Sequence, residues 1–308
     1  MITDKYIAVI GGSNVDITGL PKSGFRPNDS NPGTINISPG GVGRNIAENI
    51  ARLGLPVKLL TVIGNDSFGD YLIKECRNTG IDMSEASVLQ GGRTSIYAAI
   101  MNEAGELEAA VSDMKITEEI SPALLSGKTS FIKEAFIVIA DNNLEAETLK
   151  LLLQMRRGDI LFDAVSGVKL KKRADLIRNI NSIKLNAIEA EILSGLKVNS
   201  PASASTAAEI IAERSVSNIF ITLGAEGAFF RSRKGKWFLE PEKISAVNTT
   251  GSGDAFMAGI AFGKYNNAEG ETLLKCGMTC AGIAAESKDT VSPDLKPERL
   301  NKILRGEK

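Results

Sequence analysis

The sequence predicts an α/β protein in which helices flank a mainly parallel central sheet and a second, small β-sheet stands apart. Short apolar runs such as "YIAVIGG" and "AFIVIA" alternate with amphipathic segments, a pattern typical of parallel strands that helices bury on both faces. In one place two strand patterns follow each other around the turn "NEAGE", which indicates a hairpin outside the main sheet. The 308 residues are 43% hydrophobic, and we expect one domain over 1–308.

The N-terminal part of the chain is expected to supply strands and two helices. "YIAVIGG" has the pattern of a buried strand, whereas "TINIS" alternates like a half-exposed strand after a loop rich in Gly, Pro, Asn and Asp. Ile46, Ile50 and Leu53 recur at helical spacing, and Gly54 ends that helix. In order, the expected elements are strands at 6–12, 34–38 and 57–64 and helices within 39–54 and 66–80.

The hairpin at 93–113 marks the small sheet. Its two strand patterns flank a glycine-containing turn with no helical pattern between them. "ITG" at 17–19 and "TINIS" can join it as further strands. We therefore assign the segments at about 15–38 and 91–112 to this sheet.

After about residue 130 the strand–helix alternation returns and completes the central sheet. The basic run "KLKKRADLIR" is expected to be a solvated helix face, with phosphate binding as the alternative. The expected strands lie at 135–140, 159–164, 182–187 and 218–224, and the expected helices at 145–155, 170–180, 188–196, 203–215, 254–264, 270–286 and 297–304.

Composition excludes several classes of function. Lys and Arg number 36 and Asp and Glu 37, for a net charge of -1, so no bulk charge attracts nucleic acid or an anionic membrane. No apolar run approaches the length of a membrane span. Histidine is absent, which excludes Ser-His-Asp and Cys-His catalysis and His-ligated metals. Any proton transfer must use Asp, Glu, Lys, Tyr or Cys.

The N-terminus and the cysteines favour a cytoplasmic protein. "MITDKYIAVIGG" lacks the layout of a signal peptide, and three cysteines are too few for a disulfide framework. Cys276 and Cys280 lie four residues apart on an expected helix and can share a ligand. Because Leu273 and Ile283 belong to the same segment, a buried apolar face explains the pair better.

The stretch "NTTGSGDAFMAG", residues 248–259, carries the strongest indication of chemistry. Gly251, Ser252 and Gly253 precede a helix, whose free N–H groups and positive dipole end attract an anion. Asp254 lies in the first turn, where its negative charge would repel a bound phosphate, so a different role must explain its position. The simplest role is that of a base, which accepts the proton of a hydroxyl group while that hydroxyl attacks phosphorus. On this stretch alone, a Gly-rich loop with an Asp that favours the helix dipole explains the residues equally well.

Two stretches near the N-terminus suit the hydroxyl groups of a sugar. Asn14 and Asp16 follow a strand end and can pair with vicinal hydroxyls in a cleft, although both residue types are common in loops. Gly40 and Gly41 allow close approach at a helix start, and Asn45 lies in the first turn. This turn lacks the Gly-Lys-Ser/Thr ending of a phosphate loop.

A further candidate lies in "KLNAIEAEILSG". Asn186 and Glu189 are three residues apart at a helix start just after a strand. Such a pair can hold hydrated Mg2+ together with nucleotide phosphates. An ordinary helix cap with Glu three residues on explains it better when it is taken in isolation.

Together and in this order, these stretches resemble the ribokinase-like (PfkB) family of carbohydrate and nucleoside kinases over essentially the whole chain. "GGVGRNIAENIARLG" and "NTTGSGDAFMAG" look like the two family signatures, "KLNAIEAEILSG" like its Asn-x-x-Glu element and "ITLGAEGAFF" like its nucleotide-binding strand and turn. The resemblance implies a ribokinase-like fold in which the small sheet is a lid. It also implies phosphoryl transfer from ATP with Mg2+.

Substrate identity is implied by a closer likeness. "DSNPGTINISPGGVGRNIAENIARLG", "RTSIYAAIMNEAGE" and "SDMKIT" are similar to the corresponding stretches of pseudouridine kinases, which implies phosphorylation of the ribose 5'-hydroxyl of pseudouridine. A broader nucleoside or sugar kinase of the ribose, inosine, adenosine or fructose type stays open. A non-catalytic nucleoside sensor is disfavoured because the carboxylates of the motifs are intact. Relatives commonly form homodimers through the lid.

The resemblance also implies a role for each motif residue. Asp254 would deprotonate the 5'-hydroxyl, and Gly251, Ser252 and Gly253 would stabilise the transferring phosphoryl group. Residues assigned to the ribose are Asn14, Asp16, Gly40, Gly41, Asn45 and Asp141. Those assigned to ATP are Asn186, Glu189, Thr222, Gly224 and Gly227, with Glu189 also on Mg2+ through water. Asn248 and Thr250 would belong to a K+ site, and Ser95, Tyr97 and Asp113 are candidates to read the base.

Some positions depart from the family pattern. Asn248 stands where many members carry Asp, Ser252 replaces the usual Ala, and "AESKDTVSPDLK" lacks the usual Gly-Ala after Lys. The first departure removes a negative charge from the expected cation site and leaves K+ dependence open. Val42 and Arg44 differ from the ribokinase-type Gly-Gly-Lys-Gly-Ala-Asn, which counts against free ribose as the substrate.

Overall fold

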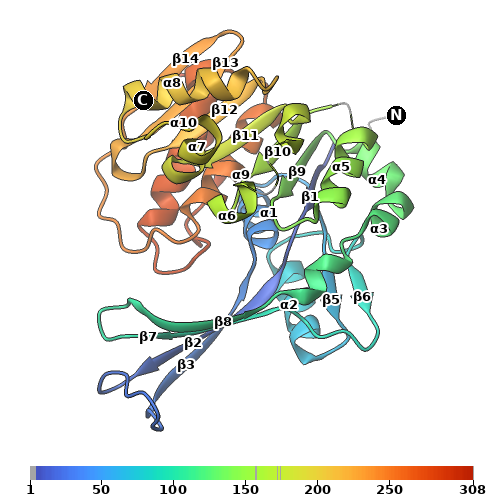
Figure 1. Cartoon of the computed structure of the whole chain (residues 1–308), viewed down its shortest axis with the longest axis vertical. Helices are drawn as coiled ribbons and strands as arrows, with labels where there is room; N and C mark the ends of the chain where they lie inside the picture. Colours follow the sequence, from blue (N-terminus) through green and yellow to red (C-terminus); the bar gives the residue numbers. More distant parts are fainter. Residues whose placement is uncertain (1–4, 157, 172, 174, 308) are drawn as a thin grey trace.

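A computed structural model of the chain describes residues 5–156, 158–171, 173 and 175–307. Its central sheet has eight strands in the order β14-β13-β12-β11-β10-β9-β1-β4 (Figure 1). The pairs from β12 to β4 are parallel, whereas β13 pairs antiparallel with both of its neighbours. The strands are β1 Ile7–Ile10, β4 Val57–Leu60, β9 Ile137–Asp141, β10 Ile160–Asp163, β11 Ser182–Asn186, β12 Asn218–Thr222, β13 Ala228–Ser232 and β14 Gly235–Leu239. This architecture confirms the predicted fold class.

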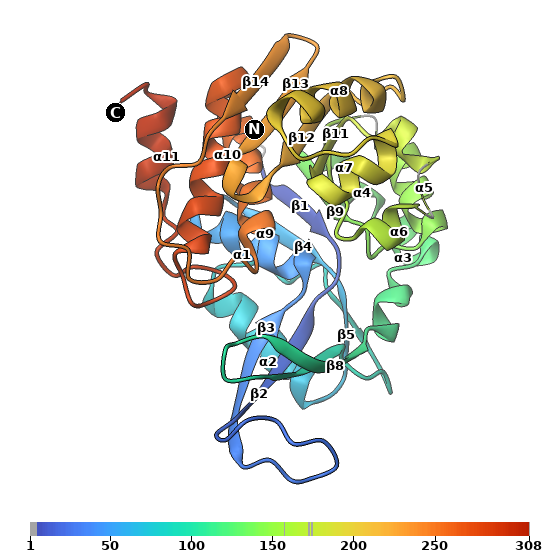
Figure 2. The same ribbon diagram turned by 60° about the vertical axis from the view of Figure 1, so that its left-hand side comes forward.

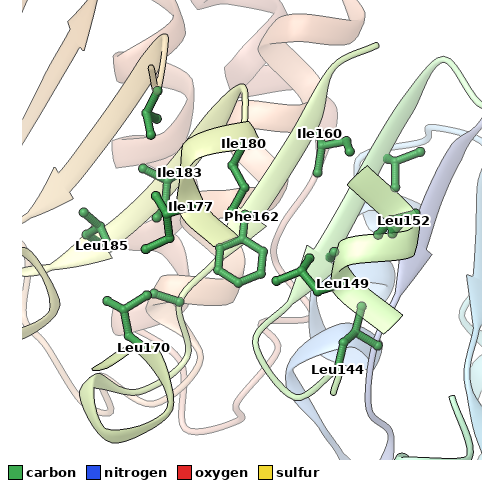
Figure 3. Close-up of a cluster of buried hydrophobic side chains, with 14 of the residues drawn as sticks. Leu144, Leu149, Leu152, Ile160, Phe162, Leu170, Ile177, Ile180, Ile183 and Leu185 are labelled. Carbon is green, nitrogen blue, oxygen red and sulfur yellow. The ribbon is translucent and has the colours of Figure 1, made fainter. Parts of the chain in front are cut away.

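Helices bury both faces of the central sheet, because successive side chains of each strand point to opposite faces. In β1, Ala8 and Ile10 pack into one apolar cluster, and Ile7 and Val9 pack into the other. Figure 3 shows part of the first cluster around Phe162. The helices that contribute to it are α3 Pro122–Gly127, α4 Thr129–Glu134, α5 Ala146–Met155, α6 Gly167–Lys171, α7 Ala187–Ser194 and α8 Pro201–Ala212.

The second cluster fills the other face of the sheet, and Figure 2 shows the helices that pack over that face. Cys276 and Cys280 are buried in it as free thiols, which confirms that they pack on a buried apolar face. The helices that contribute are α1 Val42–Arg52, α2 Ser67–Asn78, α9 Ser252–Tyr265, α10 Gly270–Ala285 and α11 Pro297–Leu304. None of the helices in the described part of the chain has the length and apolar character needed to cross a bilayer.

A four-stranded lid sheet projects from the body of the molecule (Figure 1). Its strands run in the order β3-β2-β7-β8, with bounds β2 Asn14–Pro21, β3 Gly33–Gly40, β7 Ile96–Met101 and β8 Leu107–Asp113. The two early segments therefore join the hairpin as predicted. Asp16, Tyr97 and Ser112 are cross-strand partners on one face. Val15 on the other face packs against Ile63 and α2.

Two local expectations are wrong, and one hairpin was not predicted. The run at 57–64 divides at Thr61, and its second half forms β5 Val62–Gly64, which pairs with β6 Ser87–Leu89 in a separate sheet. Both halves are buried, so the apolar run continues across the change of sheet. The helix expected at 170–180 is instead α6 followed by a 3₁₀ turn at Leu176–Asn179, with residues 172 and 174 outside the described part. The hairpin β13–β14 has no counterpart in the prediction.

Candidate active site

The carboxyl ends of neighbouring parallel strands bring three charged residues together. Asp141 at the end of β9 is the register partner of Asp163 at the end of β10, and Asp163 is the partner of Lys184 in β11. Nζ of Lys184 lies 3.0 Å from Oδ2 of Asp163, and both side chains are buried. Burial opposes the charged ammonium, but the Asp163 carboxylate leaves the pKa of Lys184 raised. Ligands bind at this edge of an open α/β sheet.

The N-terminus of α9 presents unpaired donors to the same region. Gly251 caps the helix with φ 82°, and a Cβ atom there would lie 2.0 Å from the carbonyl oxygen of Thr290. Glycine is therefore required. Within the described residues, the N–H groups of Gly253 and Asp254 have no acceptor and the Ser252 Oγ atom is buried without a partner. These orphaned groups fit an incoming phosphate.

Lys184 lies beside this helix start, and sequence reasoning missed it. A Cβ atom placed on Gly253 would lie 2.7 Å from Nζ of Lys184, so a cation stands next to the free amides. The indication in the sequence was a lysine inside the apolar strand "SIKLN". A charged residue in a buried strand needs a partner, and the structure shows that partner to be Asp163.

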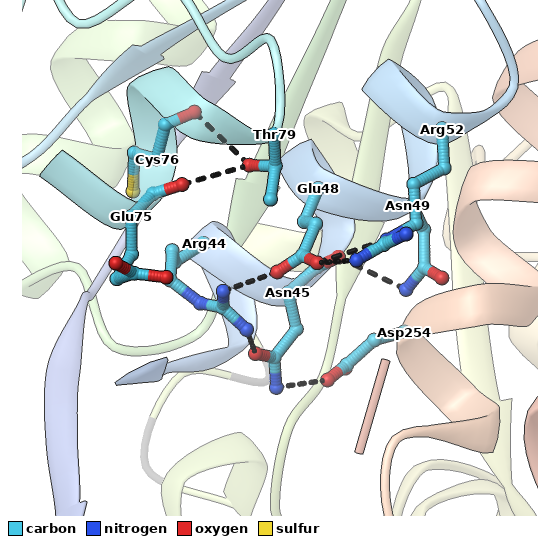
Figure 4. A network of polar contacts seen from close by, with 9 residues as sticks. All are labelled: Arg44, Asn45, Glu48, Asn49, Arg52, Glu75, Cys76, Thr79 and Asp254. Atoms are coloured by element: carbon cyan, nitrogen blue, oxygen red, sulfur yellow. Dashed lines mark hydrogen bonds and ion pairs between the residues drawn. The ribbon is translucent and has the colours of Figure 1, made fainter. Parts of the chain in front are cut away.

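Asp254 lies in the first turn of α9, where α1 meets it. The Asn45 Nδ2 atom donates to Oδ2 of Asp254 at 2.9 Å, and both side chains are buried (Figure 4). Burial raises the pKa of Asp254 to about 7, helped by the charge of Asp163 and opposed by Lys184 and by the Asn45 bond. A base with a pKa near neutrality suits proton transfer from a hydroxyl.

The residues assigned to the ribose converge where β2, β3 and α1 begin or end. The Asn14 Nδ2 atom donates to Oδ1 of Asp16 at 2.6 Å. Burial raises the pKa of Asp16, against the Asn14 bond and a nearby positive charge from Arg44. A Cβ atom on Gly40 would lie 2.2 Å from the Asp16 carboxylate. Gly41 caps α1 and so joins this group to Asn45 and Asp254.

Asp141 is tied to the backbone of two loops. Its Oδ2 atom accepts from the N–H of Gly12 at 3.1 Å, and Oδ1 accepts from the N–H of Asn143 at 2.8 Å. Burial raises its pKa to about 6. Asp141 therefore fixes the loop that follows β1, the segment that leads into Asn14.

The residues assigned to ATP lie at the ends of β11 and β12. Asn186 and Glu189 form a reciprocal capping box at the start of α7, as the simpler prediction expected. Burial raises the pKa of Glu189. Thr222 is the register partner of Asn186. Gly224 begins the 3₁₀ turn that leads into β13, and Gly227 follows it.

The remaining predicted residues are placed as follows. The Asn248 Oδ1 atom accepts from the N–H of Thr250 at 2.9 Å, and its Nδ2 atom donates to the Lys288 carbonyl at 3.2 Å. Ser95 is buried, and its hydroxyl has no hydrogen-bond partner among the described residues. Tyr97 lies on the Asp16 face of the lid. Asp113 pairs with Ile96, which pairs with Val15, so the structure places Asp113 on the opposite face from Asp16.

Comparison with known proteins identifies the family to which the chain is similar. The profile described as "pfkB family carbohydrate kinase" matches residues 4–297. The chain is 31% identical over 292 residues to "Pseudouridine kinase" of Escherichia coli (strain K12), covering 94% of this chain and 93% of the relative. It is 33% identical over 302 residues to "Uncharacterized sugar kinase YeiI" of the same strain, covering 97% and 83%. Identity alone therefore does not separate a nucleoside acceptor from a sugar.

A solved structure shows the same architecture. The protein described as "Carbohydrate kinase from Agrobacterium tumefaciens" superposes with a TM-score of 0.84 at 26% identity. The match covers 98% of this chain and 97% of that chain. Both the central sheet and the lid therefore belong to an architecture shared with a carbohydrate kinase.

Proposed function

The chain belongs to the pfkB family of carbohydrate kinases, and from that premise we propose that it transfers the γ-phosphoryl group of ATP to the 5'-hydroxyl of pseudouridine. The observation that carries the proposal is the position of Asp254. Its carboxylate has a pKa raised to about 7. It lies in the first turn of a helix whose N–H groups at Gly253 and Asp254 have no acceptor within the described part of the chain. A proton acceptor and an anion site thus share one helix terminus.

The proposed step is an in-line displacement at phosphorus. Asp254 takes the proton of the 5'-hydroxyl as that oxygen bonds to the γ-phosphorus atom, and the bond from phosphorus to the bridging oxygen of ADP breaks. The N–H groups of Gly253 and Asp254 and the ammonium of Lys184 stabilise the charge on the transferring group. Asn14, Asp16 and Asn45 hold the ribose, while Gly40, Gly41 and Asp141 keep the surrounding backbone in place.

The residues present fit Mg2+ that arrives with ATP. In the described part of the chain, no three acidic, cysteine or histidine side chains cluster as a protein-held metal requires. Mg2+ commonly keeps several waters and binds through one or two carboxylates and the phosphates of a substrate. Glu189 would hold it through water, and Asn186, Thr222, Gly224 and Gly227 would contact ATP. When bound, Mg2+ neutralises phosphate charge.

K+ fits the site less well. The Asn248 oxygen already accepts the N–H of Thr250, and its amino group faces the Lys288 carbonyl. Asn248 therefore brings no negative charge to the expected K+ site. Toward the loop at Lys288 it presents its NH2 group, which is a donor and cannot ligate a cation. We derive no step through K+ at Asn248 and Thr250.

The choice of pseudouridine is supported by the lid strands and the segment "SDMKIT", which are similar to the corresponding stretches of pseudouridine kinases. It is also supported by the relative of that name. A sugar acceptor is the alternative, because the relative described as a sugar kinase is equally similar. ADP release with pseudouridine, uridine, inosine, adenosine, ribose and fructose at equal concentration tests the choice. Pseudouridine should give the highest kcat/KM. If another acceptor gives a clearly higher kcat/KM, that acceptor is the substrate and the choice of pseudouridine is wrong.

The proposal includes a cytoplasmic homodimer that pairs through the lid. Cys76, Cys276 and Cys280 are free and buried, as in a reducing compartment. One face of the lid carries an apolar row across all four strands, formed by Ile37, Ile17, Ala98 and Val111. Because the outer members of this row are exposed, a second copy of the chain has an apolar surface to cover.

A further inference from the structure

Arg44 is a buried cation one residue before Asn45. Its side chain is 2% exposed. The Nη2 atom donates to Oδ1 of Asn45 at 2.5 Å, and the Nη1 atom donates to Oε2 of Glu48 (Figure 4). Arg44 thus contacts the oxygen end of the Asn45 amide, whose nitrogen end contacts Asp254.

The chemistry of these groups fixes how the Asn45 amide points. A guanidinium has donors and no acceptor, whereas an amide has an oxygen at one end and an NH2 group at the other. Only the amide oxygen of Asn45 can face Arg44, so the NH2 group must face Asp254. The 2.9 Å contact from Nδ2 to the Asp254 carboxylate is the result.

A chain of ion pairs holds the guanidinium in place. Glu48 accepts from Arg44 with one oxygen, and its other oxygen accepts from Nε and Nη2 of Arg52 at 2.9 and 2.7 Å. Because Glu48 has two cationic partners, the three side chains keep a net positive charge. That charge polarises the Asn45 amide toward donation.

We propose that Arg44 is a positioning residue, which orients the Asn45 amide so that it always donates to the carboxylate of Asp254. The proposal rests on the proposed function, in which Asp254 is the base. One oxygen of Asp254 is then occupied by Asn45, and the other stays free to accept the substrate proton. Arg44 acts through Asn45 and touches neither substrate.

Loss of Arg44 has a defined consequence for Asp254. A freed Asn45 amide can turn its oxygen to accept from the protonated acid, which raises the pKa of Asp254 further. The charged groups that face Asp254 from the sheet are Asp141, Asp163 and Lys184. They are unchanged by the substitution. Because the substitution also removes the charge of Arg44 itself, the Asn45→Ala background is needed to separate that direct effect on the pKa from the effect of the amide.

The experiment compares pH profiles of kcat for Arg44→Met, Asn45→Ala and the double variant. Arg44→Met should move the acidic limb upward by about one pH unit, so that activity at pH 6.5 falls about tenfold and recovers at pH 9 to within about twofold. In the Asn45→Ala background the same substitution should cause no further movement. Arg231→Met removes one of the two cationic partners of Glu209. Because neither Arg231 nor Glu209 belongs to the proposed site, this variant is the control and should leave the profile unmoved.

Two outcomes overturn the inference. One is an equal loss at every pH, since a purely structural effect is not rescued by deprotonation. The other is an undiminished upward shift of the acidic limb when Arg44→Met is made in the Asn45→Ala background. If the variants do not fold, a neutron structure of the wild-type protein decides, because an Asn45 oxygen that faces Asp254 excludes the proposal.

A measurement without turnover separates this inference from the proposed function. Carboxyl ¹³C NMR of aspartate-labelled protein, with Asp254→Asn to assign the signal, gives the pKa of Asp254 directly. If the wild-type protein phosphorylates none of the acceptors, the proposed function fails. The Arg44 inference then stands or falls on whether Arg44→Met raises that pKa.

Discussion

The ammonium of Lys184 lies 3.0 Å from the carboxylate of Asp163 and is buried with it. The pair stands at the edge of the sheet where α9 begins, and a Cβ atom on Gly253 would meet the same ammonium at 2.7 Å. Asp163 thus stabilises a buried cation that faces the proposed phosphoryl site. The two residues therefore have different expected roles: Asp163 stabilises the ammonium, and Lys184 presents its charge to the transferring phosphoryl group.

Lys184→Met should lower kcat about 100-fold, because the cation that offsets phosphoryl charge is lost. The substitution also leaves Asp163 buried without its partner, which should cost about 3 kcal/mol of unfolding free energy. Asp163→Asn in the same chain removes the unpaired charge. Denaturant unfolding and ADP release should therefore show that the double variant regains stability but not turnover. Recovery of both would assign Lys184 a structural role only.

Gly253→Ala should lower kcat about tenfold with little loss of stability. The new methyl group meets the far end of the flexible Lys184 side chain, which can move away. The displaced ammonium then no longer stands beside the free amides. Gly282→Ala in α10 is the control, since a Cβ atom there meets nothing within 4 Å. Similar kcat values for the two variants would contradict the arrangement.

Asp254→Asn should abolish most turnover, by about 10³-fold, and should stabilise the protein above pH 7. The pKa of Asp254 is raised from 3.8 to about 7, so the folded state favours the protonated acid. That stabilisation is complete below pH 4 and is lost as the pH rises through 7. Because Asn carries no charge, thermal midpoints of wild type and variant should differ by several degrees at pH 8 and converge near pH 4. The wild-type kcat should rise with pH through about 7.

K+ should have little effect on turnover. Asn248 supplies no negative charge, and its oxygen is engaged by Thr250. Replacing KCl with choline chloride at constant ionic strength should change kcat by less than about twofold. A large loss that K+ alone reverses would require other oxygen ligands in this loop.

The sequence predicts the central sheet and the lid because both depend on short-range patterns. Apolar runs separated by helical stripes identify the parallel strands, and the turn "NEAGE" identifies the hairpin. The same reasoning cannot detect that Thr61 ends one sheet and starts another, since Leu60 and Val62 are equally buried. What divides them is pairing with β6, a contact distant in sequence.

The candidate site shows the same division. Asp254 and its glycines are adjacent in sequence, so their joint role can be predicted from their order. Lys184 approaches Gly253 only because β11 and α9 meet in the fold. The hydrogen bond from Asn45 to Asp254 joins residues 209 positions apart. The proposed positioning role of Arg44 depends on that bond. Contacts of this kind come from tertiary packing and leave no local pattern.

The apolar face of the lid yields a test of the proposed homodimer. Ile37 and Val111 are 51% and 73% exposed, and they lie at the two ends of one row across the sheet. In a dimer that pairs through this face, a carboxylate at both positions would be buried without a partner, which costs several kcal/mol. In a monomer both carboxylates stay exposed to water, so the substitutions should not destabilise the chain. Light scattering after gel filtration should give a dimer for wild type and a monomer for Ile37→Asp/Val111→Asp. Val88→Asp, at an exposed position on β6, should stay dimeric, and a monomeric wild-type protein would refute pairing through the lid.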